Sequence, residues 1–289
     1  MKKTIAVLTD LSPGSEHAAI YALHLAKKLK ADVMLYNLDP VPAVGKLALA
    51  SGFSDNDEQD LMVNINDRAE ALCDRLERQI IEKSFPGSPL PEITYDEGNG
   101  EVVDVMTSVV NNDSIILIVI APRNGQDMAT CMLSDHCRQV THWATVPVMI
   151  VPGTTPIRNP EKIAITASLD EHDTDYVTAL ANLAEQFSPE IMVAHLTETI
   201  SPESSFTIAE KKLMANLYKM VDYGRVYYRR INVGGREKGW KWLNANKKCD
   251  MLVIRHQPQS ALKEFFGLGH TPQVTHHITI PIVVLPDMN

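Results

Sequence analysis

The stretch that decides the fold reads Asp113-Ser114-Ile115-Ile116-Leu117-Ile118-Val119-Ile120, a continuous apolar run behind two polar residues. A second stretch of the same kind occurs later in the chain as Cys249-Asp250-Met251-Leu252-Val253-Ile254. Because apolar side chains fill successive positions, both faces of each strand must be covered. Each stretch therefore predicts a strand of a parallel sheet that has helices on its two faces.

The landmarks around these two stretches also occur twice, in the same order. Each half opens with a short apolar strand, continues with an amphipathic helix, a second strand, a long helix and a third strand, and closes on a strand between two prolines. The paired segments are Ile5–Asp10 and Ile163–Ser168, Glu16–Leu29 and Asp173–Phe187, Asp32–Tyr36 and Glu190–His195, Asp57–Lys83 and Phe206–Val221, Ile93–Tyr95 and Val226–Ile231, and Pro147–Pro152 and Pro281–Pro286. A repeat of this length, with strands and helices alternating, predicts two copies of one α/β domain.

The domain boundaries follow from the repeat. The 289 residues divide into a first domain over 1–151, a linker over 152–160 that contains three prolines, and a second domain over 161–289. Each domain is expected to hold a mostly parallel five-stranded sheet sandwiched by helices. Ser12 and Pro13 predict the start of the first helix, since Ser caps helices well and Pro fits the first helical position.

Composition excludes several functional classes. The net charge is −9 and the pI is about 5.6, which disfavours nucleic acid and anionic membranes as partners. The longest apolar run, Ile115 to Ala121, is far shorter than the roughly 20 residues of a membrane span. The run Ile5 to Leu8 is too short for a signal peptide, so we expect a cytoplasmic protein. The four cysteines form no CxxC pair and are expected to be free thiols.

The ordered landmarks resemble those of the universal stress protein family over essentially the whole chain. Leu8-Thr9-Asp10-Leu11-Ser12 is similar to the family's first strand end, and Tyr36-Asn37-Leu38 and Ala194-His195-Leu196 resemble its "LHV". The run CDMLVIRH from Cys249 resembles its "ADLIVMG". The resemblance implies a tandem member with the adenine-nucleotide α-hydrolase-like, Rossmann-like fold. It also implies that the last strands of the two domains pair across a pseudo-two-fold axis, as an intramolecular dimer.

ATP-binding members of this family carry Gly-x-x-Gly, nine residues, and then Gly-Ser/Thr after the fourth strand. There the glycines let the backbone approach phosphates at a helix N-terminus. Alignment from the last-strand proline places these positions at Ala121, Asn124, Ser134 and Asp135 in the first half, and at Arg255, Pro258, Leu268 and Gly269 in the second. Both halves depart from the glycine pattern.

The departures predict that tight ATP binding is lost, more completely in the second half. A carboxylate at Asp135 would repel a phosphate by roughly 1–4 kcal/mol at ~4 Å. Arg255 adds bulk and Pro258 has no N–H to donate.

The adenine end is better preserved than the phosphate end. The resemblance implies that Asp10, with Thr9 and Leu38 beside it, contacts adenine or ribose, whereas Ser168 is the second-half counterpart of Asp10. The cofactor is therefore unknown, with ATP or AMP left open. The alternative for Asp10 is a cap of the first helix or of a turn.

Two further clusters of residues could each be interpreted as a binding site or as residues without a binding role. Cys131, His136, Cys137 and His142 are residue types that zinc accepts, but on a helix they spread over more than one face, so no metal site is predicted. Histidines His270, His276 and His277, with Arg255 and His256, would make the second pocket cationic and suited to an anion or a small acidic metabolite. The alternative is a scatter of surface histidines.

The sequence contains no P-loop, no Gly-x-Ser-x-Gly elbow and no His-Glu-x-x-His motif, and it offers no acid/base pair. We therefore expect a non-enzymatic universal stress response protein with degenerate nucleotide pockets, acting by ligand sensing or by interaction with a protein partner. The alternative is an ATP- or AMP-binding stress protein that uses the first-domain pocket, with slow hydrolysis. A further homodimer is left open.

Overall fold

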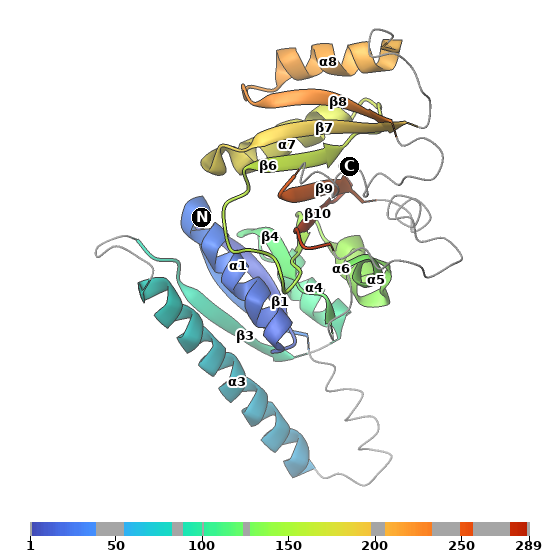
Figure 1. Cartoon of the computed structure of the whole chain (residues 1–289). Helices are drawn as coiled ribbons and strands as arrows, with labels where there is room; N and C mark the ends of the chain where they lie inside the picture. Colours follow the sequence, from blue (N-terminus) through green and yellow to red (C-terminus); the bar gives the residue numbers. More distant parts are fainter. Residues whose placement is uncertain are drawn as a thin grey trace. The chain divides into compact units, whose positions relative to one another are not determined.

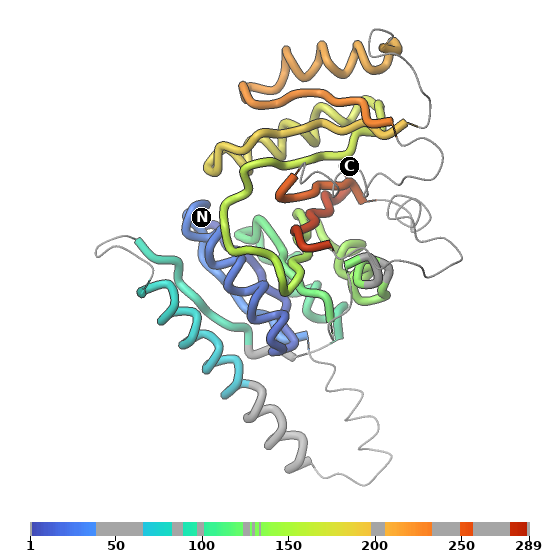
Figure 2. Tube along the Cα trace, viewed as in Figure 1, coloured from blue at the N-terminus to red at the C-terminus, as the bar shows by residue number. Residues whose placement is uncertain are grey.

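The computed structural model describes residues 2–38, 55–82, 89–99, 101–123, 128–197, 206–232, 249–256 and 278–287, with the side chains of 55–65, 97–99, 129–130 and 133 outside the description. Figure 2 draws the other segments in grey. The chain forms two compact units, Met1–Arg158 and Asn159–Asn289. Most of the elements of both units are labelled in Figure 1.

The first unit is built on a parallel sheet with the strand order β3-β2-β1-β4-β5. Its strands are β1 (Lys3–Thr9), β2 (Ala31–Asn37), β3 (Ile93–Asn99), β4 (Ile115–Ile120) and β5 (Val148–Ile150). Its helices are α1 (Pro13–Leu29), α3 (Asp55–Glu82), α4 (Val102–Val110), α5 (Met128–Leu133) and α6 (Asp135–Trp143). The chain adds strands on one side of β1 first and then on the other, so the strand order reverses between β1 and β4.

The second unit repeats this topology, with the order β10-β9-β6-β7-β8. Its elements are β6 (Lys162–Thr166), α7 (Asp173–Ala184), the 3₁₀-helix η2 (Glu185–Phe187), β7 (Glu190–Thr197), α8 (Ile208–Met220), β8 (Val226–Asn232), β9 (Met251–Arg255) and β10 (Ile282–Leu285). The predicted fold class, parallel five-stranded α/β in both halves, is confirmed. Pairing of the two units through their last strands stays a prediction.

The central strands are buried on both faces, as their apolar runs require. In β1, Ile5, Ala6 and Val7 are fully buried, and in β4 Ile118 and Val119 are as well. Side chains of successive residues point to opposite faces of a sheet, so neither face has room for a polar group. Polar side chains are therefore confined to the ends of these strands.

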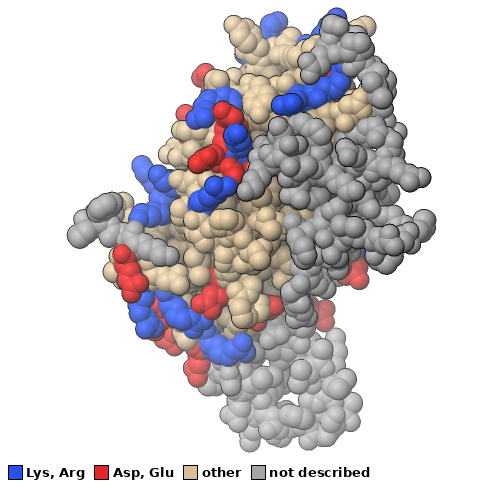
Figure 3. All heavy atoms as spheres, in the orientation of Figure 1, with Lys and Arg blue, Asp and Glu red and all other residues tan. Residues whose placement is uncertain are grey.

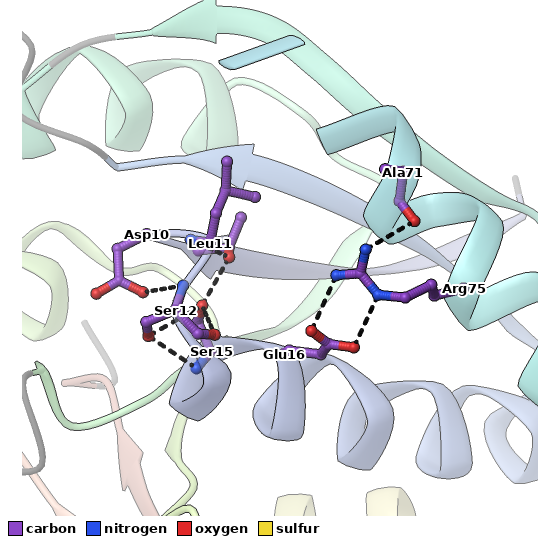
Figure 4. Close-up of polar contacts among 8 residues, drawn as sticks. Asp10, Leu11, Ser12, Ser15, Glu16, Ala71 and Arg75 are labelled. Carbon is purple, nitrogen blue, oxygen red and sulfur yellow. Dashed lines mark hydrogen bonds and ion pairs between the residues drawn. The ribbon is translucent and has the colours of Figure 1, made fainter. Parts of the chain in front are cut away.

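The first helix starts where the cap residues predict. Ser12 is the N-cap of α1, its side chain accepts a hydrogen bond from the Ser15 N–H, and Pro13 is the first helical residue. At the other end Lys30 adopts a left-handed conformation with φ 53°. Glu16 then fixes α1 to α3 through two bonds from Arg75, Nε to Oε1 at 3.1 Å and Nη2 to Oε2 at 2.9 Å (Figure 4).

In the second unit a buried ion pair joins α8 to β8. Arg230 donates from Nε to Glu210 Oε1 at 2.6 Å and from Nη2 to Oε2 at 2.5 Å, and the two side chains are 8% and 2% exposed. Tyr228 donates its hydroxyl to Glu210 at 2.7 Å, and Thr207 and Glu210 form a capping box. The hydrogen bond from Arg230 holds the pKa of Glu210 well below its usual range, despite burial. The carboxylate is thus fully satisfied.

Replacing Arg230 tests how much the second unit depends on this pair. We expect Arg230→Met to lower the unfolding temperature of that unit by roughly 5–10 °C, because Glu210 stays buried without its partner. The double change Glu210→Met with Arg230→Met is expected to recover most of the loss. Arg229→Met, at an exposed neighbouring position, is the control and is expected to change little in differential scanning calorimetry.

No helix within the described ranges has both the length and the apolar character that crossing a membrane requires.

Candidate functional site

The carboxyl end of β1 carries the polar residues that the sequence singled out. Thr9 is buried, and its Oγ1 donates to Ser15 Oγ at 2.9 Å and accepts from the Leu11 N–H at 3.0 Å. Asp10 Oδ1 accepts from the Ser12 N–H at 3.1 Å (Figure 4). Asp10 therefore closes a turn, as its structural alternative predicts, and only one of its two carboxylate oxygens is used by that bond.

The turn itself is strained. Leu11 has φ 56°, a left-handed conformation that side chains with a Cβ seldom adopt. The hydrogen bonds from Leu11 and Ser12 to the side chains of Thr9 and Asp10 hold it in place. Leu169, in the corresponding turn of the second unit, has φ 63°. The repeat thus preserves the turn geometry in both units.

Arg123 crosses the carboxyl end of the first sheet. It follows β4 by three residues, and its Nη2 donates to the carbonyl oxygen of Leu38, directly after β2, at 2.7 Å. Because β1 lies between β2 and β4, the guanidinium spans the end of β1, where Asp10 lies. A Cβ on Gly14 would be 3.7 Å from Pro122 O, so the start of α1 also lies beside this connection. Leu38 is buried, and its N–H donates to Thr9 O at 2.8 Å.

The charges at this end of the sheet interact. Burial alone would raise the pKa of Asp10, but hydrogen bonds from Ser12 and Ser15 and the charge of Arg123 outweigh it, so the pKa is lowered. Burial and the charge of Arg123 together lower the pKa of His136 to about 4, against the opposing effect of Asp10. Its Nδ1 is buried and has no hydrogen-bond partner among the described residues. Asp10, Leu38, Arg123 and His136 form what we call the Asp10 cluster.

The residues predicted to replace the glycine motif lie at the edge of this cluster. Ala121 is buried directly after β4. Ser134 is the N-cap of α6, where its Oγ accepts from the Cys137 N–H at 3.2 Å. The Asp135 side chain is 86% exposed and pairs with Arg138 at 3.0 Å, so the expected repulsion of phosphate is weaker than its position suggested. Asn124 lies outside the described residues.

In the second unit an ion pair fills the corresponding end of the sheet. The Ser168 and Leu169 N–H groups donate to the buried Asp173 carboxylate at 3.3 and 2.7 Å. Arg255, the last residue of β9, bonds to Asp170, lies 3.5 Å from Asp173 Oδ1, and stacks over the Tyr176 ring at 4.6 Å. Two carboxylates therefore offset the charge of Arg255.

Because Asp170 and Asp173 offset the charge of Arg255, Arg255 adds less positive charge to the predicted anion site than the sequence suggests. His256 also has an acidic neighbour, with its Nδ1 3.5 Å from Asp287 Oδ2. His270, His276 and His277, like Pro258, Leu268 and Gly269, lie outside the described residues. The anion site thus stays a prediction, and the charge that Arg255 brings to it is shared with Asp170 and Asp173.

Cys131 of α5 and Cys137 of α6 behave as core residues. Cys131 and Cys137 are buried free thiols, and their hydrogen bond together with burial raises the pKa of Cys137. Within the part of the chain that the structure describes, no three His, Cys, Asp or Glu side chains gather as metal ligands would.

Comparison with known proteins identifies the family. A model of the universal stress protein family matches residues 1–152, more than half of the chain. The chain belongs to this family. A universal stress protein from Archaeoglobus fulgidus DSM 4304 is 12% identical and superposes with a TM-score of 0.52, covering 98% of this chain and 96% of that one.

Other solved structures share the fold of this universal stress protein. A Pseudomonas aeruginosa UCBPP-PA14 protein provisionally assigned to the family is 13% identical, with a TM-score of 0.50 over 99% of this chain and 93% of that one. The cytoplasmic domain of a prokaryotic cation chloride cotransporter is 8% identical, with a TM-score of 0.51 over 99% and 96%. Such identities show the fold alone. A comparison with curated proteins finds no match.

Two residues of the candidate site were missed or misread from the sequence. Arg123 was not considered, although a Pro-Arg pair directly after a central strand lies where ligands bind in open α/β sheets. His136 was considered only as a metal ligand, yet it lies with Arg123 and Asp10.

The low pKa of His136 predicts a pH dependence of stability. The unfolded chain binds a proton near pH 6.5, whereas the folded site stays neutral down to pH of about 4. Stability contributed by the neutral imidazole is therefore present above pH 6.5 and lost as the pH falls toward 4. We expect wild type to lose about 1–3 kcal/mol more than His136→Gln across this range in urea unfolding. Equal losses would show that His136 titrates normally.

Proposed function

We propose that this universal stress protein is a non-enzymatic sensor that binds a small ligand at the Asp10 cluster of its first unit. The observation that carries the proposal is the juxtaposition of an ionised carboxylate, a guanidinium and a buried imidazole nitrogen without a described partner, all at the carboxyl end of a parallel sheet. Ligands of open α/β sheets bind at this end, where the strand order reverses.

The chemistry of the cluster fits a ligand with two different ends. Asp10 and the Leu38 carbonyl accept hydrogen bonds, which suits the donor groups of adenine or ribose. Arg123 offers a guanidinium for a phosphate or carboxylate. His136 has a nitrogen that bonds a ligand in either the donor or the acceptor tautomer. AMP, and by extension ATP, combines these groups.

The hydrogen bond from Arg123 to Leu38 sets a limit on affinity. A ligand amine that donates to Leu38 O has to displace the Arg123 Nη2, which bonds that oxygen at 2.7 Å. The guanidinium that leaves is then available to the anionic end of the same ligand. We therefore expect binding that is weaker than in a site with free glycine backbone, and dependent on an anionic group.

Binding rather than catalysis is supported by what surrounds the cluster. In the described residues the hydroxyls beside Asp10 are committed to structure, since Ser15 Oγ donates to Ser12 O at 2.9 Å and Ser12 caps α1. The carboxylate beside them, Asp10, has a lowered pKa and is therefore a weak general base for either hydroxyl. Slow ATP hydrolysis remains the alternative function, and it predicts phosphate release that depends on Asp10.

The second unit is proposed to serve as a scaffold or a surface for a protein partner. There Arg255, Asp170 and Asp173 satisfy one another at the end of β6 and β9. A ligand that enters this end has to break an ion pair that is partly shielded from water. Breaking it is unfavourable in free energy unless the ligand replaces both charges.

Calorimetric titration of AMP, ATP and adenosine tests the proposal. We expect AMP to bind with a dissociation constant of roughly 100 μM, and Asp10→Asn, which retains the turn-closing oxygen, to weaken it at least about tenfold. Adenosine is expected to bind more weakly than AMP, because it lacks the group that Arg123 takes. Ser168→Ala, at the corresponding second-unit position, is the matched control and should leave binding unchanged.

Absence of heat with all three ligands would contradict the sensor function and leave protein interaction as the role. Equal binding by Asp10→Asn would contradict the assignment of the ligand site to the Asp10 cluster. Phosphate release from ATP by wild type and not by Asp10→Asn would establish the alternative.

A further inference from the structure

Helices α3 and α8 occupy equivalent places in the two units but carry opposite charge. Each lies between the second and third strands of its unit. α3 has nine acidic and three basic residues, a net of −6, whereas α8 has one acidic and three basic residues, a net of +2. The units differ in the same sense: the first has 21 acidic and 13 basic residues, a net of −8, and the second 15 and 14, a net of −1. Figure 3 shows that charges of both signs lie on the face drawn.

The outward face of α3 is an acidic stripe. Residues spaced alternately three and four apart lie on one face of a helix. The exposed residues with this spacing are Asp67, Glu70, Asp74, Glu77 and Ile81, the last 60% exposed. Carboxylates at these spacings repel one another. Burial, with smaller contributions from the charges of Glu77, Asp74 and Glu70, raises the pKa of Cys73 to about 11.

Two of the three basic residues of α3 leave this stripe largely uncompensated, and the third, Arg68, lies outside its three-and-four spacing. Arg75 is turned to Glu16 on α1, and Arg78, at the border of the stripe, donates its Nε to the Asp74 carbonyl rather than to a carboxylate. The inward face holds the apolar residues Leu72, Leu76 and Ile80.

The outward face of α8 is a basic and apolar stripe. Its single acidic residue, Glu210, is buried on the other side against Arg230. Ile208 and Tyr218 are 88% and 91% exposed, the highest values among the large apolar side chains of the described residues. The stripe consists of Ile208, Lys211, Lys212, Ala215, Tyr218 and Lys219.

We propose that the acidic stripe of α3 in one copy of this chain packs against the basic stripe of α8 in a second copy. Four carboxylates face three ammonium groups, and Ile81 of one stripe and Ile208 and Tyr218 of the other are covered. Both stripes have the alternating spacing through which helices pack side by side, and Ala215 permits close approach.

Charge reversal with a swap tests this contact on the full chain. Sedimentation velocity of wild type at roughly 100 μM and about 0.1 M salt should show a mass above the 32.1 kDa of one chain. The α8 variant Lys211→Glu, Lys212→Glu, Lys219→Glu should be monomeric, because both stripes are then acidic. The α3 variant Glu70→Lys, Asp74→Lys, Glu77→Lys should be monomeric for the converse reason.

Mixing the two variants should restore association, since each acidic stripe then meets a basic one. Circular dichroism checks that each variant is folded, and Lys27→Glu, Lys28→Glu, Lys30→Glu is the control with the same change of charge on α1. A monomeric wild type, association that survives the α8 change, or a mixture that stays monomeric would each overturn the proposal. None of these results depends on whether the Asp10 cluster binds nucleotide.

Discussion

Burial of β1 and β4 on both faces is the constraint on which the rest of the first unit depends. Ile5, Val7, Ile118 and Val119 leave no position within these strands for a polar side chain. Parallel strands also end at the same edge of the sheet, so the first polar residues after each strand meet there. Thr9, Asp10, Leu38 and Arg123 are brought together in this way, although 114 residues of sequence separate the first from the last.

The two units apply one topology to different chemistry. Both hold a leucine in a left-handed turn after the first strand, with φ 56° at Leu11 and 63° at Leu169. The first unit stabilises this turn with short local side chains, Thr9 and Asp10, which leaves Arg123 to interact with the end of β2. The second unit stabilises it with Asp173, which in turn attracts Arg255. The hydrogen bonds that hold this turn thus differ between the proposed ligand site of the first unit and the internally paired residues of the second.

The sequence predicts the repeat, the strands and the first helix cap well, because these depend on local signals. Continuous apolar runs indicate β4 and β9, and Ser12-Pro13 places the start of α1 within one turn. The directions of long side chains depend on neighbours that only the fold supplies. Arg123 reaches Leu38 across 85 positions, and Arg255 reaches Asp170 across another 85, so neither contact has a local signal. Asp135 shows the same limit, since its place in the glycine-motif alignment was predicted but its pairing with Arg138 was not.

In the proposed function, the first unit binds a small ligand and the second does not. Amide chemical shifts in the nuclear magnetic resonance spectrum, followed as AMP is added, test it most directly. If AMP binds at the Asp10 cluster, we expect the amide signals of Thr9 to Ser12, Leu38 and Arg123 to shift and those of Ser168 to Asp173 to stay unchanged. Shifts at Ser168 to Asp173, or none at Asp10 and its neighbours, would contradict it.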